Sequence, residues 1–275
     1  MSGMPRIIDS HVHIWPDGLV QKNLELISRL SGITPAYSGS VSSLHTCMVN
    51  CQTSQSCVNN LVQKPELLRK ANDWTANAVA EEKDKLVGVG FLVAGARESV
   101  GEAQRCASEL GFKGFKMHHS HMRVLPGDER NWSIYEKISE LGLPVLFHCG
   151  RNPFSKDGMQ FAVPKNFETV LSSFDKMKVI LGHLAGYEDD PEDAAMVLGN
   201  HKNVFADTAV DFSKITRQEN LREFIQSAGT ERFVFGSDFP ILDPLIAKDW
   251  LCKNLSPKQF LTVVEENPRK LFSLS

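Results

Sequence analysis

The run Leu143-Pro144-Val145-Leu146-Phe147-His148 is short and apolar, which is typical of a buried β-strand. A segment with helical periodicity, Trp132–Leu141, precedes it, and another, Phe167–Phe174, follows it. Val179–His183 then repeats the strand pattern. Strand and helix therefore alternate in this part of the chain, which favours a parallel sheet with crossover helices.

The same alternation extends through almost the whole chain. The expected strands are Arg6–Ile14, Leu44–Asn50, Lys85–Val93, Phe112–His118, Pro144–His148, Val179–His183, Val204–Thr208 and Phe233–Asp238. The expected helices are Pro65–Lys83, Ser99–Leu110, Trp132–Leu141, Phe167–Phe174, Pro191–Leu198, Gln218–Ala228 and Pro257–Phe272. Eight such units predict an α/β fold closed into a (β/α)8 TIM barrel. A doubly wound open sheet is the alternative, but no Gly-rich phosphate loop follows the first strand.

The length of 275 residues suits one barrel domain spanning residues 1–275. Residues 17–43 are harder to place, because Gly18, Gly32, Pro35 and Gly39 interrupt a short apolar helix. We expect a long insertion with its own helix between the first strand and the second. Such loops cover the catalytic face of a barrel, so this one is either a lid or substrate wall or a solvent-exposed linker.

Composition restricts the partners. The net charge of −3 is spread without long runs of one sign, which indicates no nucleic-acid partner and no anionic membrane surface. The sequence has no apolar run of membrane-spanning length, and its N-terminus lacks the apolar region of a signal peptide. We therefore expect a cytoplasmic protein that acts on a small molecule, and a homo-oligomer stays open.

Histidines and one acid fall where strands end. His11 and His13 lie two residues apart on one strand, so both imidazoles project from the same face. His-x-His alone is a weak signal, since His119 and His121 have the same spacing. However, His148, His183 and Asp238 end three other predicted strands, and the C-terminal ends of barrel strands meet at one rim.

Such a donor set suits one divalent ion, with Zn²⁺ as the first choice for imidazole and carboxylate ligands. The metal ligands are predicted to be His11, His13, His148 and Asp238. An open coordination position would activate water and polarise a carbonyl group. Asp238 would accept the proton from that water, and His183 would orient the water or the substrate. The alternative for either residue is a rim side chain satisfied by neighbouring backbone groups.

Three further residues are candidates for substrate binding. Lys116 and His118 alternate on one face of a predicted strand end, so both are expected to point into the site. Lys116 could hold an anionic group of the substrate, or be carboxylated and bridge two metals, or be an exposed rim lysine. Arg151 follows His148 and could clamp a carboxylate, although a solvated loop arginine is as consistent with its position.

Taken together, these residues resemble the amidohydrolase superfamily, and within it the amidohydrolase-2 group of lactonases, hydratases and decarboxylases. The resemblance spans nearly the whole chain. It rests on the motifs Ile8-Asp9-Ser10-His11-Val12-His13, Gly114-Phe115-Lys116-Met117-His118, His148, Gly182-His183, Gly236-Ser237-Asp238-Phe239-Pro240 and Glu266-Asn267-Pro268-Arg269-Lys270-Leu271-Phe272.

The resemblance implies His11, His13, His148 and Asp238 as ligands of a metal, usually zinc, with His183 as a catalytic residue beside it. Members that decarboxylate aromatic acids often have glutamate in place of the first histidine and are usually longer. His11 and the modest length therefore favour hydrolysis. Members with two metals generally have a carboxylated lysine or a glutamate on the third or fourth strand. Lys116 could take that role, but the third strand offers no acid, so one ion is preferred.

The expected function is metal-dependent hydrolysis of a small carbonyl compound, such as a lactone or cyclic amide that bears a carboxylate. The alternative is metal-dependent decarboxylation of an unsaturated or aromatic acid at the same rim. A third hypothesis is a non-catalytic barrel that serves as a binding or scaffold protein, which the intact set of strand-end ligands argues against.

Overall fold

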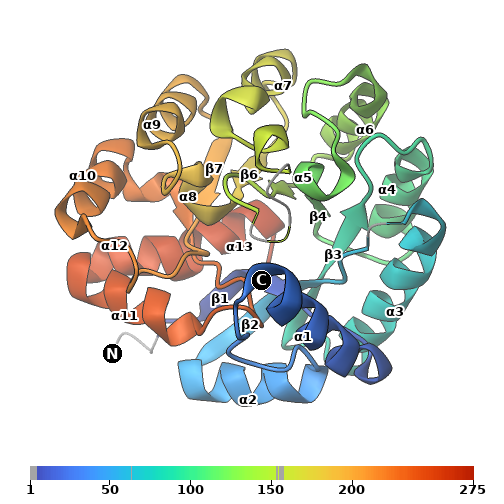
Figure 1. Ribbon diagram of the computed structural model, residues 1–275, viewed down its shortest axis with the longest axis horizontal. Coiled ribbons are helices and arrows are strands. Elements are labelled where there is room, and N and C mark those ends of the chain that lie inside the picture. Colours follow the sequence, from blue (N-terminus) through green and yellow to red (C-terminus); the bar gives the residue numbers. More distant parts are fainter. Residues whose placement is uncertain (1–4, 63, 153, 155–157) are drawn as a thin grey trace.

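The computed structural model describes residues 5–62, 64–152, 154 and 158–275. Eight parallel strands follow one another around a single sheet in chain order (Figure 1). They are β1 (Ile7–His13), β2 (Thr53–Asn59), β3 (Leu86–Leu92), β4 (Gly114–Met117), β5 (Val145–Phe147), β6 (Val179–Leu181), β7 (Val204–Asp207) and β8 (Phe233–Val234). The predicted (β/α)8 TIM barrel is confirmed.

The barrel closes between β1 and the segment that follows β8. The backbone nitrogen of Ser10 donates to Phe235 O at 2.8 Å, and Asp238 N donates to His11 O at 2.9 Å. Val12 forms a parallel bridge with Phe239. These bonds bring the first and last strands together, so that the ends of the chain contribute to one rim.

Helices surround the strands on all sides (Figure 1). The α-helices are α1 (Asp17–Ser31), α2 (Val41–Cys51), α3 (Leu68–Glu81), α4 (Glu98–Ser108), α5 (His119–Met122), α6 (Trp132–Leu141), α7 (Glu168–Ser173), α8 (Gly182–Gly186), α9 (Pro191–Asn200), α10 (Gln218–Ala228), α11 (Pro244–Asn254), α12 (Pro257–Leu261) and α13 (Asn267–Phe272). Short 3₁₀ turns are η1 (Pro65–Leu67), η2 (Glu129–Asn131), η3 (Met159–Phe161), η4 (Pro164–Phe167) and η5 (Thr230–Arg232), and η6 (Thr262–Glu266) is π-helical.

The second predicted strand is wrong. Leu44–Asn50 belongs to α2, whose N-terminus is capped by the Ser40 side chain. The buried residues of α2 recur with helical spacing, namely Leu44, Cys47, Met48 and Cys51. The true second strand, Thr53–Asn59, is polar in its first half and becomes buried only from Ser56 onward. Its strand conformation comes from pairing with β1 and β3 rather than from its composition.

The predicted insertion at 17–43 contains α1 and the loop that follows it. That loop is hydrogen-bonded to the segments that follow the first and the last strand. Trp15 N, after β1, donates to Gly39 O at 2.9 Å, and Tyr37 N donates to Pro240 O, after β8, at 3.1 Å. The helix α1 buries only Ile27, while Leu19, Leu26 and Leu30 are exposed. The insertion is therefore joined to the β1 and β8 ends by its loop rather than by a buried helix face.

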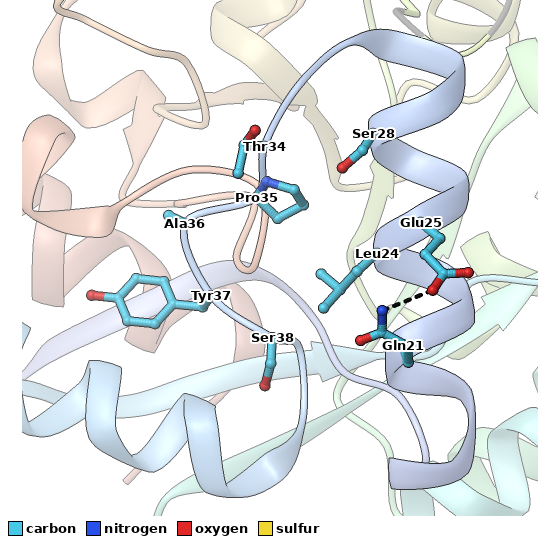
Figure 2. A pocket seen from close by; sticks show the side chains of 9 residues that line it. All are labelled: Gln21, Leu24, Glu25, Ser28, Thr34, Pro35, Ala36, Tyr37 and Ser38. Atoms are coloured by element: carbon cyan, nitrogen blue, oxygen red, sulfur yellow. Dashed lines mark hydrogen bonds between the residues drawn. The ribbon is translucent and has the colours of Figure 1, made fainter.

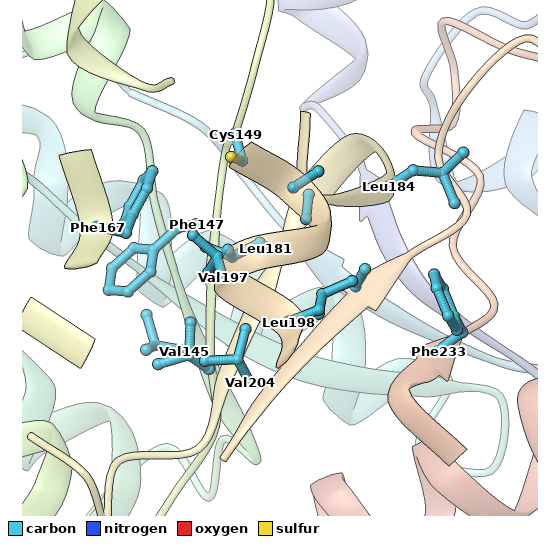
Figure 3. Packing of buried hydrophobic residues seen from close by; sticks show 14 of the residues in the cluster. Val145, Phe147, Cys149, Phe167, Leu181, Leu184, Val197, Leu198, Val204 and Phe233 are labelled. Carbon is cyan, nitrogen blue, oxygen red and sulfur yellow. The ribbon is translucent and has the colours of Figure 1, made fainter. Parts of the chain in front are cut away.

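Two of the clusters of buried apolar side chains lie on either side of the barrel wall. Between the strands and the outer helices, side chains such as Phe147, Phe167, Val197 and Phe233 pack together (Figure 3). Inside the barrel lies a second cluster, formed by Ile8, Cys57, Val87, Val89, Leu146, Ile180, Val234, Leu271 and Phe272. Within the described ranges, no helix combines the length and the apolar character needed to span a membrane.

Alternate side chains of a strand point to the same side, so the residues that face the barrel interior can be followed to the rim. Leu146 belongs to the interior cluster, so His148, which is two residues further and directly follows β5, projects to the same side. On β4, Lys116 is fully buried, and His118 follows two residues later. The residues at the C-terminal ends of the strands therefore meet above the interior cluster.

Candidate metal centre

Two histidines from β1 are held in defined orientations by side chains from other strands. His11 Nδ1 donates to Asp207 Oδ2 on β7 at 2.8 Å. The side-chain nitrogen of Asn59 donates to Val12 O, so the side-chain oxygen of Asn59 faces His13. His13 Nδ1 donates to this oxygen, Asn59 Oδ1, at 2.9 Å. Both imidazoles therefore carry their proton on Nδ1 and present the lone pair of Nε2.

These lone pairs converge with the carboxylate of Asp238. The two Nε2 atoms are 3.2 Å apart, and Asp238 Oδ1 lies 3.5 Å from His11 Nε2 and 3.2 Å from His13 Nε2. Atoms bound tetrahedrally to one ion at about 2.1 Å are roughly 3.4 Å apart. Three electron-rich atoms at such distances repel one another unless a cation lies between them. These side chains are the one group of three or more metal-type ligands found among the described residues.

The position of Asp238 depends on the close approach of three strands. Its backbone is left-handed, with φ of 60°. At Gly236, a Cβ atom would lie 2.9 Å from His11 Cβ and 3.1 Å from Asp207 Cβ, so only glycine permits this approach. Asp9 supports the same region, because Oδ1 accepts from His11 N at 3.2 Å and from Ser237 N at 3.0 Å.

The protonation states of Asp238 and His11 favour the binding of a cation. Burial disfavours the charged form of Asp238, but the close contact with His13 and the nearby His11 and His183 outweigh it and lower the pKa to about 2. Burial lowers the pKa of His11 well below its usual value, and the charge of Lys116 adds to this effect. At neutral pH the group therefore consists of a carboxylate and a neutral imidazole of His11, which are forms that bind metal.

Lys116 is the cation closest to this group. Its side chain is 1% exposed, and Nζ donates to His11 Nε2 at 2.8 Å. Burial lowers the pKa of Lys116 to about 8, while Asp238 and Asp207 act in the opposite direction. The predicted orientation of Lys116 into the site is what the structure has, and an exposed rim lysine is excluded.

His148 and His183 lie beside the group rather than within it. His183 Nδ1 donates to Ala209 O at 2.7 Å, so its Nε2 accepts from His148 Nδ1 at 2.9 Å. Nε2 of His148 is therefore unprotonated, and it is buried without a hydrogen-bond partner in the described part of the chain. The structure thus orients His148 as a ligand would be oriented, although it is not one of the three atoms in close contact.

The two remaining candidates differ in position. His118 is buried and stacks on His148, with ring centroids 4.0 Å apart. Arg151 is exposed, and its backbone N–H donates to Asp189. The structure therefore brings His118 to the site and leaves the Arg151 side chain at its edge.

Sequence reasoning missed three polar residues around the site. Asp207 lies one residue before the end of the predicted strand Val204–Thr208, which is a signal in the sequence, but nothing in the pattern pairs it with His11. Asn59 was hidden because the second strand was misplaced. In the sequence, His121 only repeats the His-x-His spacing, yet in the structure its ring stacks on His118 with centroids 3.6 Å apart.

A separate pocket of about 420 Å³ lies between α1 and residues 34–38 (Figure 2). Its wall includes Leu24 and Glu25 of α1 and Pro35 of the loop. No predicted site residue lines it. The pocket is therefore distinct from the metal group at the strand ends.

Known proteins similar to this chain include several decarboxylases. Gamma-resorcylate decarboxylase from a Polaromonas species is 26% identical over 230 residues, which are 67% of this chain and 69% of that protein. The structure of 2,6-dihydroxybenzoate decarboxylase from Rhizobium matches with a TM-score of 0.76 at 16% identity, covering 98% of this chain and 99% of the other.

A dihydroxybenzoic acid decarboxylase from Polaromonas, solved with manganese and the inhibitor 2-nitroresorcinol, matches with a TM-score of 0.73 at 17% identity. That match covers 98% of both chains.

These relatives correct the functional expectation. The predicted hydrolase is wrong, because the similar proteins named above are decarboxylases, which break a carbon–carbon bond instead of adding water. Retention of His11 and a modest length are therefore not signs of hydrolysis. The amidohydrolase family model matches residues 8–274. The chain thus belongs to the amidohydrolase family, as its strand-end motifs indicated.

Proposed function

We propose that this protein is a metal-dependent decarboxylase of an unsaturated or aromatic carboxylic acid. The observation that carries the proposal is the convergence of His11 Nε2, His13 Nε2 and Asp238 Oδ1, with the buried ammonium group of Lys116 beside them. Such a site combines a cation-binding group with a second positive charge for an anionic substrate. The similarity to gamma-resorcylate decarboxylase supports the reaction type.

The metal would be held by His11, His13 and Asp238, with His148 as a fourth ligand through its free Nε2. When bound, a divalent ion would supply a Lewis acid that holds oxygen atoms of the substrate. Imidazole-rich ligation favours zinc, whereas the Polaromonas structure contains manganese. We propose a single ion, because the described residues contain one such ligand group. An ion held by His11 Nε2 would replace the hydrogen bond from Lys116 Nζ and leave that amine for the substrate.

The residues of the chain would then divide the remaining tasks. Lys116 would bind the substrate carboxylate through a charge-assisted hydrogen bond, and His118 would line the substrate side of the site. During decarboxylation the bond between the carboxyl carbon and its neighbour breaks. The electron pair stays on the neighbouring carbon, which takes up a proton. The carboxyl group leaves as carbon dioxide, and the proton comes from water. Asp238, which is a carboxylate at neutral pH, and His183 are the proposed groups that accept this proton and pass it to the carbon.

The proposal is tested by product analysis. The purified protein is stripped of metal, reloaded with Mn²⁺ or Zn²⁺, and incubated with a panel of hydroxybenzoic and unsaturated carboxylic acids. Release of carbon dioxide and loss of the acid are measured together. We expect metal-dependent release of carbon dioxide, and we expect His13→Ala to reduce it by about 100-fold or more.

His45→Ala serves as the matched control, because His45 lies on α2 with its ring near Glu82, away from the metal group. This variant should retain full activity. The proposal is abandoned if the fully loaded protein releases no carbon dioxide from any acid, or if His13→Ala is as active as the parent protein.

A further inference from the structure

A stack of three imidazole rings extends away from the metal group. His148 stacks on His118 with an interplanar angle of 11°, and His118 stacks on His121 at 2° with centroids 3.6 Å apart. His121 belongs to the short helix α5, which begins directly after His118 at the end of β4. The stack therefore places His121 two rings away from His148, beyond His118.

The environment of His121 differs from that of its neighbour His119. His119 Nε2 is hydrogen-bonded to the hydroxyl of Tyr135 at 2.9 Å within the core. In contrast, both Nδ1 and Nε2 of His121 are buried and find no hydrogen-bond partner in the ranges that the structure describes. A buried polar atom without a partner is costly, so such atoms commonly serve a ligand.

The charges around His121 connect it to the site. Burial lowers the pKa of His121 to about 4, and His13 and Lys116 contribute to the decrease. The ring is therefore neutral at physiological pH, with one donor and one acceptor nitrogen. It also lies within the electrostatic range of one predicted metal ligand and of the proposed carboxylate-binding lysine.

We propose that His121 is a substrate-binding residue that selects acids bearing a hydroxyl group on the ring. This inference rests on the proposed function, because it assigns the substrate class of the same site. A hydroxyl group both donates and accepts, so it can satisfy either nitrogen of a neutral imidazole. A hydrogen atom or a methyl group at that position would leave both nitrogens unpaired in the complex, which penalises such substrates.

The proposal predicts that the preference for hydroxyl-bearing acids depends on the side chain of His121. Loss of a hydrogen bond between buried groups changes affinity by about ten- to a hundredfold. His121→Phe keeps an aromatic ring for the stack and removes both nitrogens. His121→Leu removes them without a ring, so either variant gives the result if the other fails to fold. His121→Asn restores a donor and an acceptor.

The experiment compares benzoate with its 2-, 3- and 4-hydroxy derivatives. Binding to the metal-loaded protein is measured by calorimetry, and release of carbon dioxide is measured in parallel. We expect at least one hydroxybenzoate to bind the parent protein about tenfold or more tightly than benzoate. The Phe and Leu variants should lose this preference while their affinity for benzoate changes less than about twofold, and the Asn variant should recover part of it.

His45→Phe on α2 is the control and should keep the parent preference. The inference is overturned if the parent protein shows no preference, if the Phe and Leu variants keep it, or if benzoate affinity falls equally. Failure of the decarboxylase proposal is distinguishable: hydroxyl-dependent binding would still be lost in the variants, but no acid would release carbon dioxide.

Discussion

His11 Nδ1 lies 2.8 Å from Asp207 Oδ2, although 196 residues separate them in the sequence. The other oxygen of Asp207 accepts from the backbone nitrogens of His183, at 2.7 Å, and Ala209, at 3.0 Å. One buried carboxylate therefore fixes the tautomer of His11 and also the start of the turn that carries His183. The orientation of the metal group depends on this residue as much as on the ligands themselves.

We predict that Asp207→Asn weakens metal binding by about ten- to a hundredfold. An amide is a weaker acceptor than a carboxylate, so His11 would be held less firmly with its Nε2 lone pair toward the ion. The dissociation constant is measured by competition with a chelator. Asp211→Asn in the same loop should leave the constant unchanged, because Asp211 pairs with Lys214 instead. An unchanged affinity in a folded Asp207→Asn protein would contradict the orienting role.

Lys116→Met should raise the KM for the carboxylic acid by about ten- to a hundredfold, because the substrate would lose a charge-assisted hydrogen bond in a buried site. Metal content should stay the same, since Lys116 is not a proposed ligand. KM is obtained from initial rates of acid consumption. Lys214→Met is the control, because Lys214 is 74% exposed. An equal KM in both variants would show that Lys116 does not bind the carboxylate.

The lowered pKa of Lys116 also predicts a pH dependence of stability in the metal-free protein. The folded chain releases this proton at about 8, whereas the unfolded chain keeps it up to 10.5. Between these values the unfolded state binds more protons, so the free energy of unfolding rises with pH. The contribution is absent below about pH 8 and reaches about 3 kcal/mol above about pH 10.5.

The measurement is urea unfolding of the parent protein and of Lys116→Met at pH 8 and at pH 10.5. As pH rises, the free energy of unfolding of the parent protein should increase relative to that of Lys116→Met. Other groups titrate equally in both proteins, so they cancel in this difference. Parallel curves for the two proteins would mean that the pKa of Lys116 is the same in the folded and unfolded states.

Phe147→Ala should lower the free energy of unfolding by about 3–5 kcal/mol, because it leaves a cavity in the outer core. Phe147 is completely buried and packs on Phe167 and Tyr135, with ring centroids 5.4 Å and 5.9 Å away. Leu30→Ala on α1 is the control, since Leu30 is 49% exposed, and its effect should stay within about 0.5 kcal/mol. Denaturant titration measures both, and equal effects would show that the site around Phe147 collapses to fill the space.

The strands that could be predicted are those whose apolar residues face both the barrel interior and the outer helices. β5 is such a strand, because Val145, Leu146 and Phe147 are all buried. The second strand failed because Thr53–Asn59 begins with half-exposed polar residues, while the more apolar Leu44–Asn50 is the inner part of a helix. Local composition cannot separate a buried helix from a buried strand when both are short.

The sequence by itself determined the barrel and placed His11, His13, His148, His183 and Asp238 at or beyond the C-terminal ends of strands, because alternation is a local property of the chain. It did not determine every strand boundary: Asp238, predicted to end the strand Phe233–Asp238, lies beyond β8, which ends at Val234. Only the tertiary structure decided which side chains meet: Asp207 with His11, Asn59 with His13, and His121 with His118. These pairs arise when the barrel closes and brings separate strands to one rim. No local pattern encodes a partner on another strand, so the orientation of each lone pair appears only in the folded chain.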